Sequence, residues 1–221
     1  MNLCARTMQV LKNFSLINES MMFRKGNKLV TMSSMKEMMA HATIQETIPR
    51  DFGIYNLNKF LGTVSLFENP ELEFESKFVR IQNGKQSADF FYTDETMIEQ
   101  PNYKEIVLNN PEINFELTSQ VYSTVQKALH VLQLPNIAFV GDGSTIKVAA
   151  VEDQKKSASN VFQVEVGETQ HEFRAVIKSE LMKLLPETYN VSISSKGLAS
   201  FKGSDVQYWI AVDGKNSSFK K

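Results

Sequence analysis

The sequence predicts an α+β fold built from two tandem copies of one domain, each with two helices on an antiparallel sheet. Two observations lead to this prediction. Four short segments have apolar residues at helical spacing, and the segments between them read as strands. The same order of segments also recurs: Phe52 and Phe173, 121 residues apart, each stand in an extended run that leads into a short Leu-rich helix. A repeated order favours a duplicated domain over a single mixed sheet.

Composition limits the class of protein. The chain has 221 residues, 42% of them hydrophobic, which is enough for one large or two small domains with a core. A formal charge of -1 argues against a protein that grips DNA over its whole surface. The single cysteine, Cys4, excludes an intramolecular disulfide and favours a reducing cytoplasm. No run approaches the roughly 20 apolar residues of a membrane span, and no secretory signal is recognisable, so no membrane association is expected.

The first half begins with a predicted helix over Ala5 to Asn18. Residues 21–34 then form two extended runs around a Lys25-Gly26-Asn27 turn, which predicts a hairpin. A second helix is predicted over Asn56 to Phe67. Its Gly62 costs about 1 kcal/mol against Ala, so we expect it to permit a close backbone approach. The runs ELEFES, FVRIQNG and SADFFYTD follow as a meander of three strands.

The second half repeats this order. A helix is predicted over Thr118 to Gln133, followed by a hairpin around Gly141-Asp142-Gly143. A short helix over Ser179 to Leu185 is expected to stop at Pro186. The runs YNVSISSKG, LASFKGS and VQYWIAVDG complete a second meander.

The join between the halves is predicted in the segment TDETMIEQPNYKEIVLNNP. Its two prolines, Asn-rich turns and weak periodicity are typical of a surface linker. The predicted boundaries are therefore an N-terminal domain at 1–93, a connector at 94–111 and a C-terminal domain at 112–221. The alternative is that this segment is a loop of a single domain.

The polar faces of the helices point to a phosphate partner. Lys12, Lys59, Lys127 and Lys183 each lie opposite the apolar stripe of their helix, although a lysine on a solvated face is common. The absence of acids is more informative. The ranges 1–18, 56–67 and 118–133 contain no Asp or Glu, although the chain has 25. Only the fourth helix carries an acid, Glu180. We infer that acids are kept off one surface, as a protein that faces phosphates requires.

No catalytic arrangement competes with this interpretation. The three histidines, His41, His130 and His171, are scattered and have no metal-ligand spacing. The run FVGDGS lacks the continuation of a phosphate-binding loop and is better explained as a hairpin turn. Glu71, Glu73 and Glu75 alternate along a strand, which suits a solvated edge better than a general acid and base. The sequence therefore predicts neither an enzyme nor a metal or cofactor site.

At this point the residues resemble a known family. The run LKNFSLIN, the Gly-turn segment after it and FGIYNLNKFLGTVSL resemble the N-terminal domain of the sliding clamps of large tailed phages, the processivity factors of their DNA polymerases. The second half, with LQLPNIAF and the terminal YWIAVDG strand, is similar to their C-terminal domain. The resemblance covers nearly the whole chain in order, and its most specific part is Leu11 to Phe67. It departs most in the linker and in Glu152 to Gln170.

The resemblance implies a ring. Three two-domain subunits would assemble head to tail as a homotrimer, with helices lining a hole around duplex DNA that is bound without sequence preference. Sparse, loose phosphate contacts suit a clamp that slides. The residues expected to line the pore are basic: Arg6, Lys12, Lys59, Lys127, His130 and Lys183. His130 is a departure from a permanent charge.

The resemblance also implies partners. They are the phage DNA polymerase, a clamp loader ATPase complex and, in late transcription, sigma or co-activator proteins, all in the cytoplasm of the infected bacterial host. A hydrophobic pocket near the connector would take a partner peptide. Its expected residues are Ile106, Leu108, Tyr208, Trp209 and Ile210, although Trp209 could equally be a core aromatic.

Two rival functions come from other classes of protein. A duplicated β-rich phage structural or interaction module would explain the repeat but not the acid-free helix faces. A small hydrolase using acids and His171 would need polar groups that converge in a pocket, and the spacing gives no sign of them.

Overall fold

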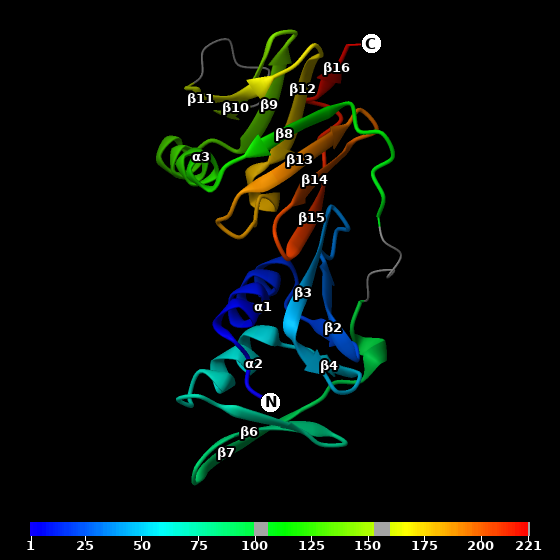
Figure 1. Ribbon diagram of the computed structural model, residues 1–221, viewed down its shortest axis with the longest axis vertical. Helices are drawn as coiled ribbons and strands as arrows, with labels where there is room; N and C mark the ends of the chain where they lie inside the picture. Colours follow the sequence, from blue (N-terminus) through cyan, green and yellow to red (C-terminus); the bar gives the residue numbers. More distant parts are fainter. Residues whose placement is uncertain (100–105, 153–159, 221) are drawn as a thin grey trace. The chain divides into compact units, whose positions relative to one another are not determined.

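A computed structural model describes residues 1–99, 106–152 and 160–220 (Figure 1). The chain forms two compact units, Met1–Lys104 and Glu105–Lys221, each with its own core. Part of the predicted connector, residues 100–105, lies outside the described residues. Within the described part of the chain, no helix is both long enough and apolar enough to cross a membrane.

Each unit contains a long helix, four strands, a short helix or 3-10 turn and three further strands in that order, which confirms the predicted α+β class and its duplication. The second unit also has β8 before its helix and β16 after its last three strands. The first unit consists of α1 (Ala5–Ile17), β1 (Met21–Phe23), β2 (Gly26–Met32), β3 (Met38–Ile48), β4 (Phe52–Ile54), α2 (Leu57–Val64), β5 (Glu71–Phe74), β6 (Phe78–Asn83), β7 (Gln86–Phe91) and the 3-10 turn η1 (Glu95–Met97). The second unit consists of β8 (Ile113–Leu117), α3 (Ser119–Leu132), β9 (Asn136–Asp142), β10 (Thr145–Val151), β11 (Phe162–Glu168), β12 (Glu172–Lys178), the 3-10 turn η2 (Ser179–Leu181), β13 (Tyr189–Ser194), β14 (Leu198–Lys202), β15 (Val206–Ala211) and β16 (Ser218–Phe219).

The strands of the first unit pair antiparallel, but the hairpin predicted over residues 21–34 is wrong. β1 pairs with β4 and β2 pairs with β3, while β5, β6 and β7 form the expected meander. The β1–β4 pair is buried and stacks Phe23 on Phe52, and at its end Asp51 accepts hydrogen bonds from the backbone N–H of Lys25 and the guanidinium of Arg24. These contacts hold the chain after β1 beside the start of β4, so the backbone of β1 pairs there.

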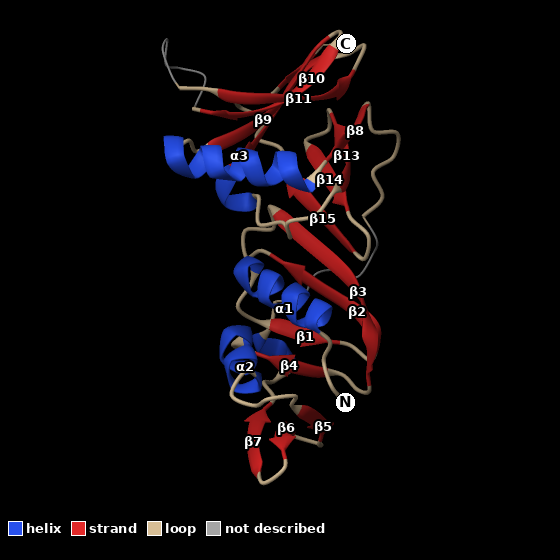
Figure 2. Cartoon of the chain, turned by 60° about the vertical axis from the view of Figure 1, so that its left-hand side comes forward, coloured by secondary structure: helices blue, strands red, loops and turns tan. Residues whose placement is uncertain are grey.

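The core of the first unit is aromatic on its β4 side. The Phe52 ring stacks on Phe23 at 4.6 Å between centroids and on Tyr92 at 4.9 Å. Gly53 leaves room for the Ile98 side chain, because a Cβ built on Gly53 would lie only 2.5 Å from Ile98 Cδ1. Helices α1 and α2 lie side by side on one side of this unit (Figure 2).

Gly62 does not play the structural role predicted for it. It is exposed in α2, and a Cβ added there would meet nothing within 4 Å. No part of the described chain therefore requires a glycine at this position.

The second unit has two antiparallel layers. One contains strands in the order β11-β10-β9-β12-β16, which includes the predicted hairpin at residues 141–143, and the other contains β15-β14-β13-β8. Their inner faces meet at Phe139, whose ring centroid lies 5.5 Å from that of Phe115 and 6.0 Å from that of Phe201.

The predicted fourth helix, Ser179 to Leu185, is wrong: only the 3-10 turn η2 forms. Pro186 cannot donate a backbone hydrogen bond and disfavours helical geometry at Leu185. Tyrosine hydroxyls bind the backbone instead. Tyr122 donates to the Met182 carbonyl at 2.7 Å, and Tyr189 donates to the Leu185 carbonyl at 2.6 Å. These side chains replace the bonds that a helix would have made.

Candidate nucleic-acid interface

Helix α1 presents Lys12 to solvent because its apolar side is buried. Val10, Leu11 and Phe14 are at most 1% exposed, whereas Lys12 is exposed. At its N-terminus, the carboxylate of Glu46 accepts hydrogen bonds from the Cys4 backbone N–H and the Thr7 hydroxyl. Arg6, in the first turn, is half-buried.

Helix α2 presents Lys59 in the same way. The Asn56 side chain caps the helix by accepting a hydrogen bond from the Lys59 backbone N–H at 2.8 Å. Leu57, Phe60 and Leu61 are buried and fix the orientation of the helix, so the Lys59 side chain lies on the exposed side.

Helix α3 carries the corresponding residues of the second unit. Thr118 caps it through the Val121 backbone N–H, and Val125 and Leu129 are buried. Lys127 and His130 are both exposed and lie three residues apart, so they share a face of the helix.

Lys183 lies outside any helix, after η2. It is exposed between Met182 and Leu184, which are both buried, so the segment is anchored on either side of it. The sequence predicts Lys183 on a fourth pore helix. In the structure it is an exposed residue of a loop instead.

The charge on these helices is of one sign. Helices α1, α2 and α3 comprise 13, 8 and 14 residues, and none contains Asp or Glu. Lys12, Lys59 and Lys127 make no ion pair with a described residue. Several basic side chains elsewhere are paired, as in the bidentate contact of Arg80 with Asp89. The helix lysines therefore remain available to an external anion.

The predicted partner-peptide residues separate into two groups. Ile106, Leu108 and Trp209 line one groove of the second unit. Tyr208 and Ile210 point to the opposite face of β15, because side chains alternate along a strand, and both are completely buried. Sequence reasoning missed the polar residues of the groove, although the alternation of polar and apolar residues in β13 and β14 could have indicated them.

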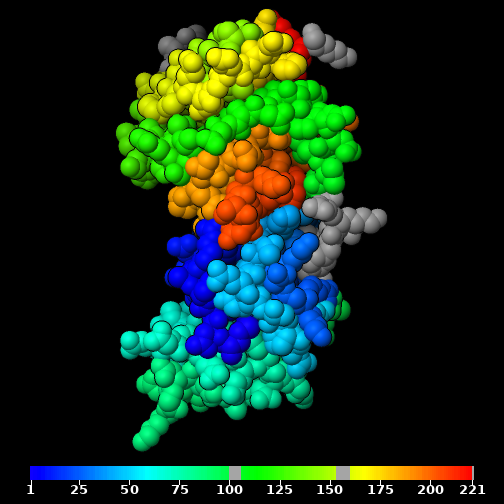
Figure 3. All heavy atoms as spheres, in the orientation of Figure 1, coloured from blue at the N-terminus to red at the C-terminus, as the bar shows by residue number. Residues whose placement is uncertain are grey.

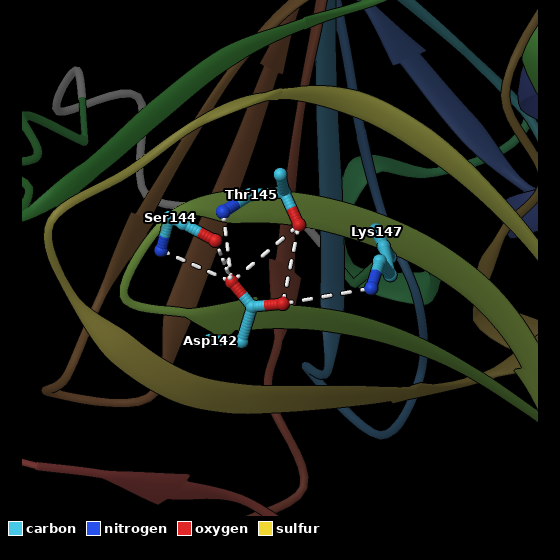
Figure 4. Close-up of polar contacts among 4 residues, drawn as sticks. All are labelled: Asp142, Ser144, Thr145 and Lys147. Carbon is cyan, nitrogen blue, oxygen red and sulfur yellow. Dashed lines mark hydrogen bonds and ion pairs between the residues drawn. The ribbon is translucent and has the colours of Figure 1, made fainter.

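No other part of the described chain has the character of a catalytic or metal site. Among the described residues, no group of three or more His, Cys, Asp or Glu could hold a metal. The FVGDGS run forms a hairpin turn in which Asp142 accepts hydrogen bonds from Ser144 and Thr145 and contacts Lys147 (Figure 4). The backbone N–H of Thr145 and the Ser144 hydroxyl hold the pKa of Asp142 well below its usual range. Its carboxylate is occupied in shaping the turn.

Comparisons with known proteins agree with this arrangement. The family described as DNA polymerase processivity factor matches residues 5–92, and the family described as gp45 sliding clamp, C terminal, matches residues 114–214. The sliding clamp of Vibrio phage KVP40 is 31% identical in an alignment that covers 96% of this chain and 99% of that relative.

Solved structures resemble the fold. Proliferating Cellular Nuclear Antigen from Entamoeba histolytica has a TM-score of 0.70 and 13% identity over 93% of this chain and 94% of that one. A. fulgidus PCNA with the C-terminal region of FEN-1 bound has a TM-score of 0.69, 13% identity and the same coverage. At this identity the two structures show the fold alone.

Proposed function

Because the chain belongs to the sliding clamp family of DNA polymerase processivity factors, we infer that it encircles duplex DNA and keeps a polymerase on its template. One observation assigns DNA contact to particular residues: α1, α2 and α3 contain no acids, and each exposes a lysine. Lysines without carboxylate partners attract phosphates through long-range electrostatics. Sparse contacts of this kind allow sliding, because they carry no base specificity.

The pore residues follow from this charge pattern. Lys12, Lys59 and Lys127 are the principal phosphate contacts, because each is exposed and unpaired within the described chain. His130, Arg6 and Lys183 complete the basic set with smaller contributions. The domain boundaries at 93 and 111 and the role of 94–111 as a connector belong to the same proposal.

Two open strand edges support assembly into a ring. β7 is the outer strand of β5-β6-β7, and β11 is the outer strand of β11-β10-β9-β12-β16. The β6–β7 hairpin projects from the first unit (Figure 3). Pairing β7 of one copy with β11 of the next would satisfy both edges and is heterologous, so it closes only for the correct number of subunits. We propose three subunits.

Partner binding is assigned to the groove lined by Ile106, Leu108 and Trp209. The comparison structure with a bound C-terminal protein region makes peptide docking a reasonable role for it. The partners proposed are the phage polymerase, the clamp loader ATPase and late-transcription co-activators, in the cytoplasm of the infected host. The chain itself is proposed to have no catalytic activity and to need no cofactor.

The test combines mass and processivity. Light scattering over a dilution series should give about three subunits that dissociate at low concentration. The triple variant Lys12→Glu, Lys59→Glu and Lys127→Glu should keep that mass and its melting temperature but lose processive synthesis with the loader and polymerase. The matched control changes Lys28, Lys196 and Lys215, which are exposed outside the helices and away from β7 and β11, to Glu. A strict monomer at high concentration would exclude encirclement. Equal loss of processivity in both triple variants would exclude the helix lysines as the contacts.

A further inference from the structure

One face of the β13–β14–β15 meander is polar and lies opposite the core. Strand register arranges its side chains in two adjacent rows across the three strands. The first row is Asn190, Lys202 and Gln207, and the second is Ser192, Ser200 and Trp209. All six line a groove of about 300 Å³.

The wall of this groove is apolar. It is formed by Ile106, Val107, Leu108 and Pro111, at the start of the second unit. Val107 is 66% exposed, whereas Trp209 on the floor is only 2% exposed. The groove therefore offers an apolar side that water still reaches, above a tryptophan that is already largely covered.

Lys202 is the only charged residue among the described residues that line the groove. It is exposed and has no ion pair with a described residue. Glu116, on β8, belongs to the same row but is separated from Lys202 by Asn190. At about 4.8 Å per strand, that places the two backbones roughly 10 Å apart, and no ion pair joins the two side chains. The groove thus has one cation with no acid beside it.

The spacing of the two rows matches an extended peptide. Lys202 and Ser200 are two residues apart on β14, a distance of roughly 6.8 Å along the strand. Alternate side chains of an extended peptide have the same separation. In a peptide that runs along β14, one side chain can pack on Val107 over the row that contains Trp209. The peptide side chain two positions away then lies over Lys202.

We propose that this groove recognises an extended segment of a partner protein in which an acidic side chain stands two residues from an apolar anchor. The anchor packs against Val107 over the row of Ser192, Ser200 and Trp209, and the carboxylate pairs with Lys202. This inference rests on the partner-binding role proposed above and adds the determinant of specificity. The ammonium group of Lys202 is a point charge on a flexible stem, so it can pair with a carboxylate without bidentate geometry.

The sole tryptophan of the chain, Trp209, is a built-in reporter for the experiment. Three end-blocked peptides with a central Leu are titrated into the assembled protein. Their cores are Asp-Ser-Leu-Ser-Asp, Asn-Ser-Leu-Ser-Asn and Ser-Asp-Leu-Asp-Ser. The symmetrical design makes chain direction irrelevant, and the third peptide has the charge of the first at the wrong spacing.

For the wild-type protein we expect the first peptide to bind about three- to fivefold more tightly than the other two at low salt, which is the range of an exposed ion pair. The advantage should shrink as salt rises. Lys202→Gln should remove it, and Lys196→Gln, at the other end of the β13–β14 hairpin, should keep it.

Each contrary result has a separate meaning. Equal binding of the first and second peptides would overturn the role of Lys202, and equal binding of the first and third would overturn the spacing. If calorimetry detects no binding of any peptide, the groove is not a docking site. The clamp function is tested separately, by the subunit mass and by the processivity of the helix-lysine variants. A negative peptide titration therefore leaves the clamp function standing.

Discussion

The hydroxyl of Tyr122, on α3, donates a 2.7 Å hydrogen bond to the carbonyl oxygen of Met182, 60 residues away in sequence. The same hydroxyl accepts a hydrogen bond from the Leu184 backbone N–H at 3.2 Å. Burial raises the pKa of Tyr122 to about 12, so the hydroxyl keeps its proton at neutral pH. One side chain thus fixes the loop that carries Lys183 and takes the place of the helix that the sequence predicts there.

Tyr122→Phe is expected to lower the free energy of unfolding by about 1–3 kcal/mol, because it leaves the Leu184 backbone N–H without its hydroxyl partner and removes one of the two hydrogen bonds to the Met182 carbonyl. Amide exchange at Leu184 should accelerate more than exchange in β9. Urea unfolding and hydrogen exchange measure the two effects. Tyr55→Phe, at a residue 58% exposed, is the control and should change neither. Unchanged exchange at Leu184 in Tyr122→Phe would contradict the proposed anchoring.

Glu46 should make the stability of the first unit depend on pH. Burial alone would raise its pKa, but hydrogen bonds from the Thr7 hydroxyl and the Cys4 backbone N–H outweigh burial and hold the pKa below its usual range. The stability that Glu46 contributes is therefore fully present above the unfolded-state pKa of about 4.3. It is lost as the pH falls through the lower folded-state pKa.

Glu46→Gln should cost about 1 kcal/mol at pH near 7, and this difference from wild type should disappear in strong acid. Urea unfolding at fixed protein concentration measures it, because assembly also stabilises the folded state. Glu68→Gln, at an exposed residue, should behave as wild type at both pH values. A difference that persists in acid would mean that the charge of Glu46 is not the cause.

Two glycines should respond in opposite directions to alanine. Gly53→Ala forces a Cβ against Ile98 and the Thr93 carbonyl oxygen, which lies 2.9 Å from its position, and should cost about 1–3 kcal/mol. Gly62→Ala, in an open helical site, should gain about 0.5–1 kcal/mol from helix propensity. Thermal unfolding of both variants provides the comparison. Destabilisation by Gly62→Ala would show that this glycine has a structural role in the folded protein.

The edge strand β7 should control assembly through Phe91. This side chain is 66% exposed, and its ring centroid lies 5.4 Å from that of Phe78. Exposed apolar surface on an open strand edge favours pairing with another chain. Phe91→Ser should raise the concentration at which the assembly dissociates about tenfold, as measured by light scattering. The matched control is Leu66→Ser, at a residue 75% exposed after α2, which should leave assembly unchanged. Equal effects of the two changes would remove β7 from the interface.

Local patterning predicted most of the elements. Helices α1, α2 and α3 lie within the predicted ranges, because each combines a capping residue with a continuous apolar stripe. Both meanders follow the expected order, since alternation and turn residues are themselves local signals. The lysines on the exposed sides of the helices follow from the same periodicity.

The wrong predictions share one cause, which is contact between residues that are not neighbours in sequence. The pairing of β1 with β4 brings Phe23 onto Phe52 and Asp51 onto Arg24 and Lys25, residues that are far apart along the chain. The loss of the fourth helix depends on tyrosines brought from α3 and from β13. The separation of Trp209 from Tyr208 and Ile210 depends on which face of β15 packs on the core.

The sequence by itself determined the α+β class, the duplication and the acid-free helix faces, because these features are set by residues close to one another along the chain. Only the tertiary structure decided which strands pair, that Lys183 lies on a loop, and that Lys202 stands two residues from the tryptophan row of an apolar groove. Hydrogen bonds and packing between distant segments compete with local preference, and their outcome depends on which residues the completed fold brings together.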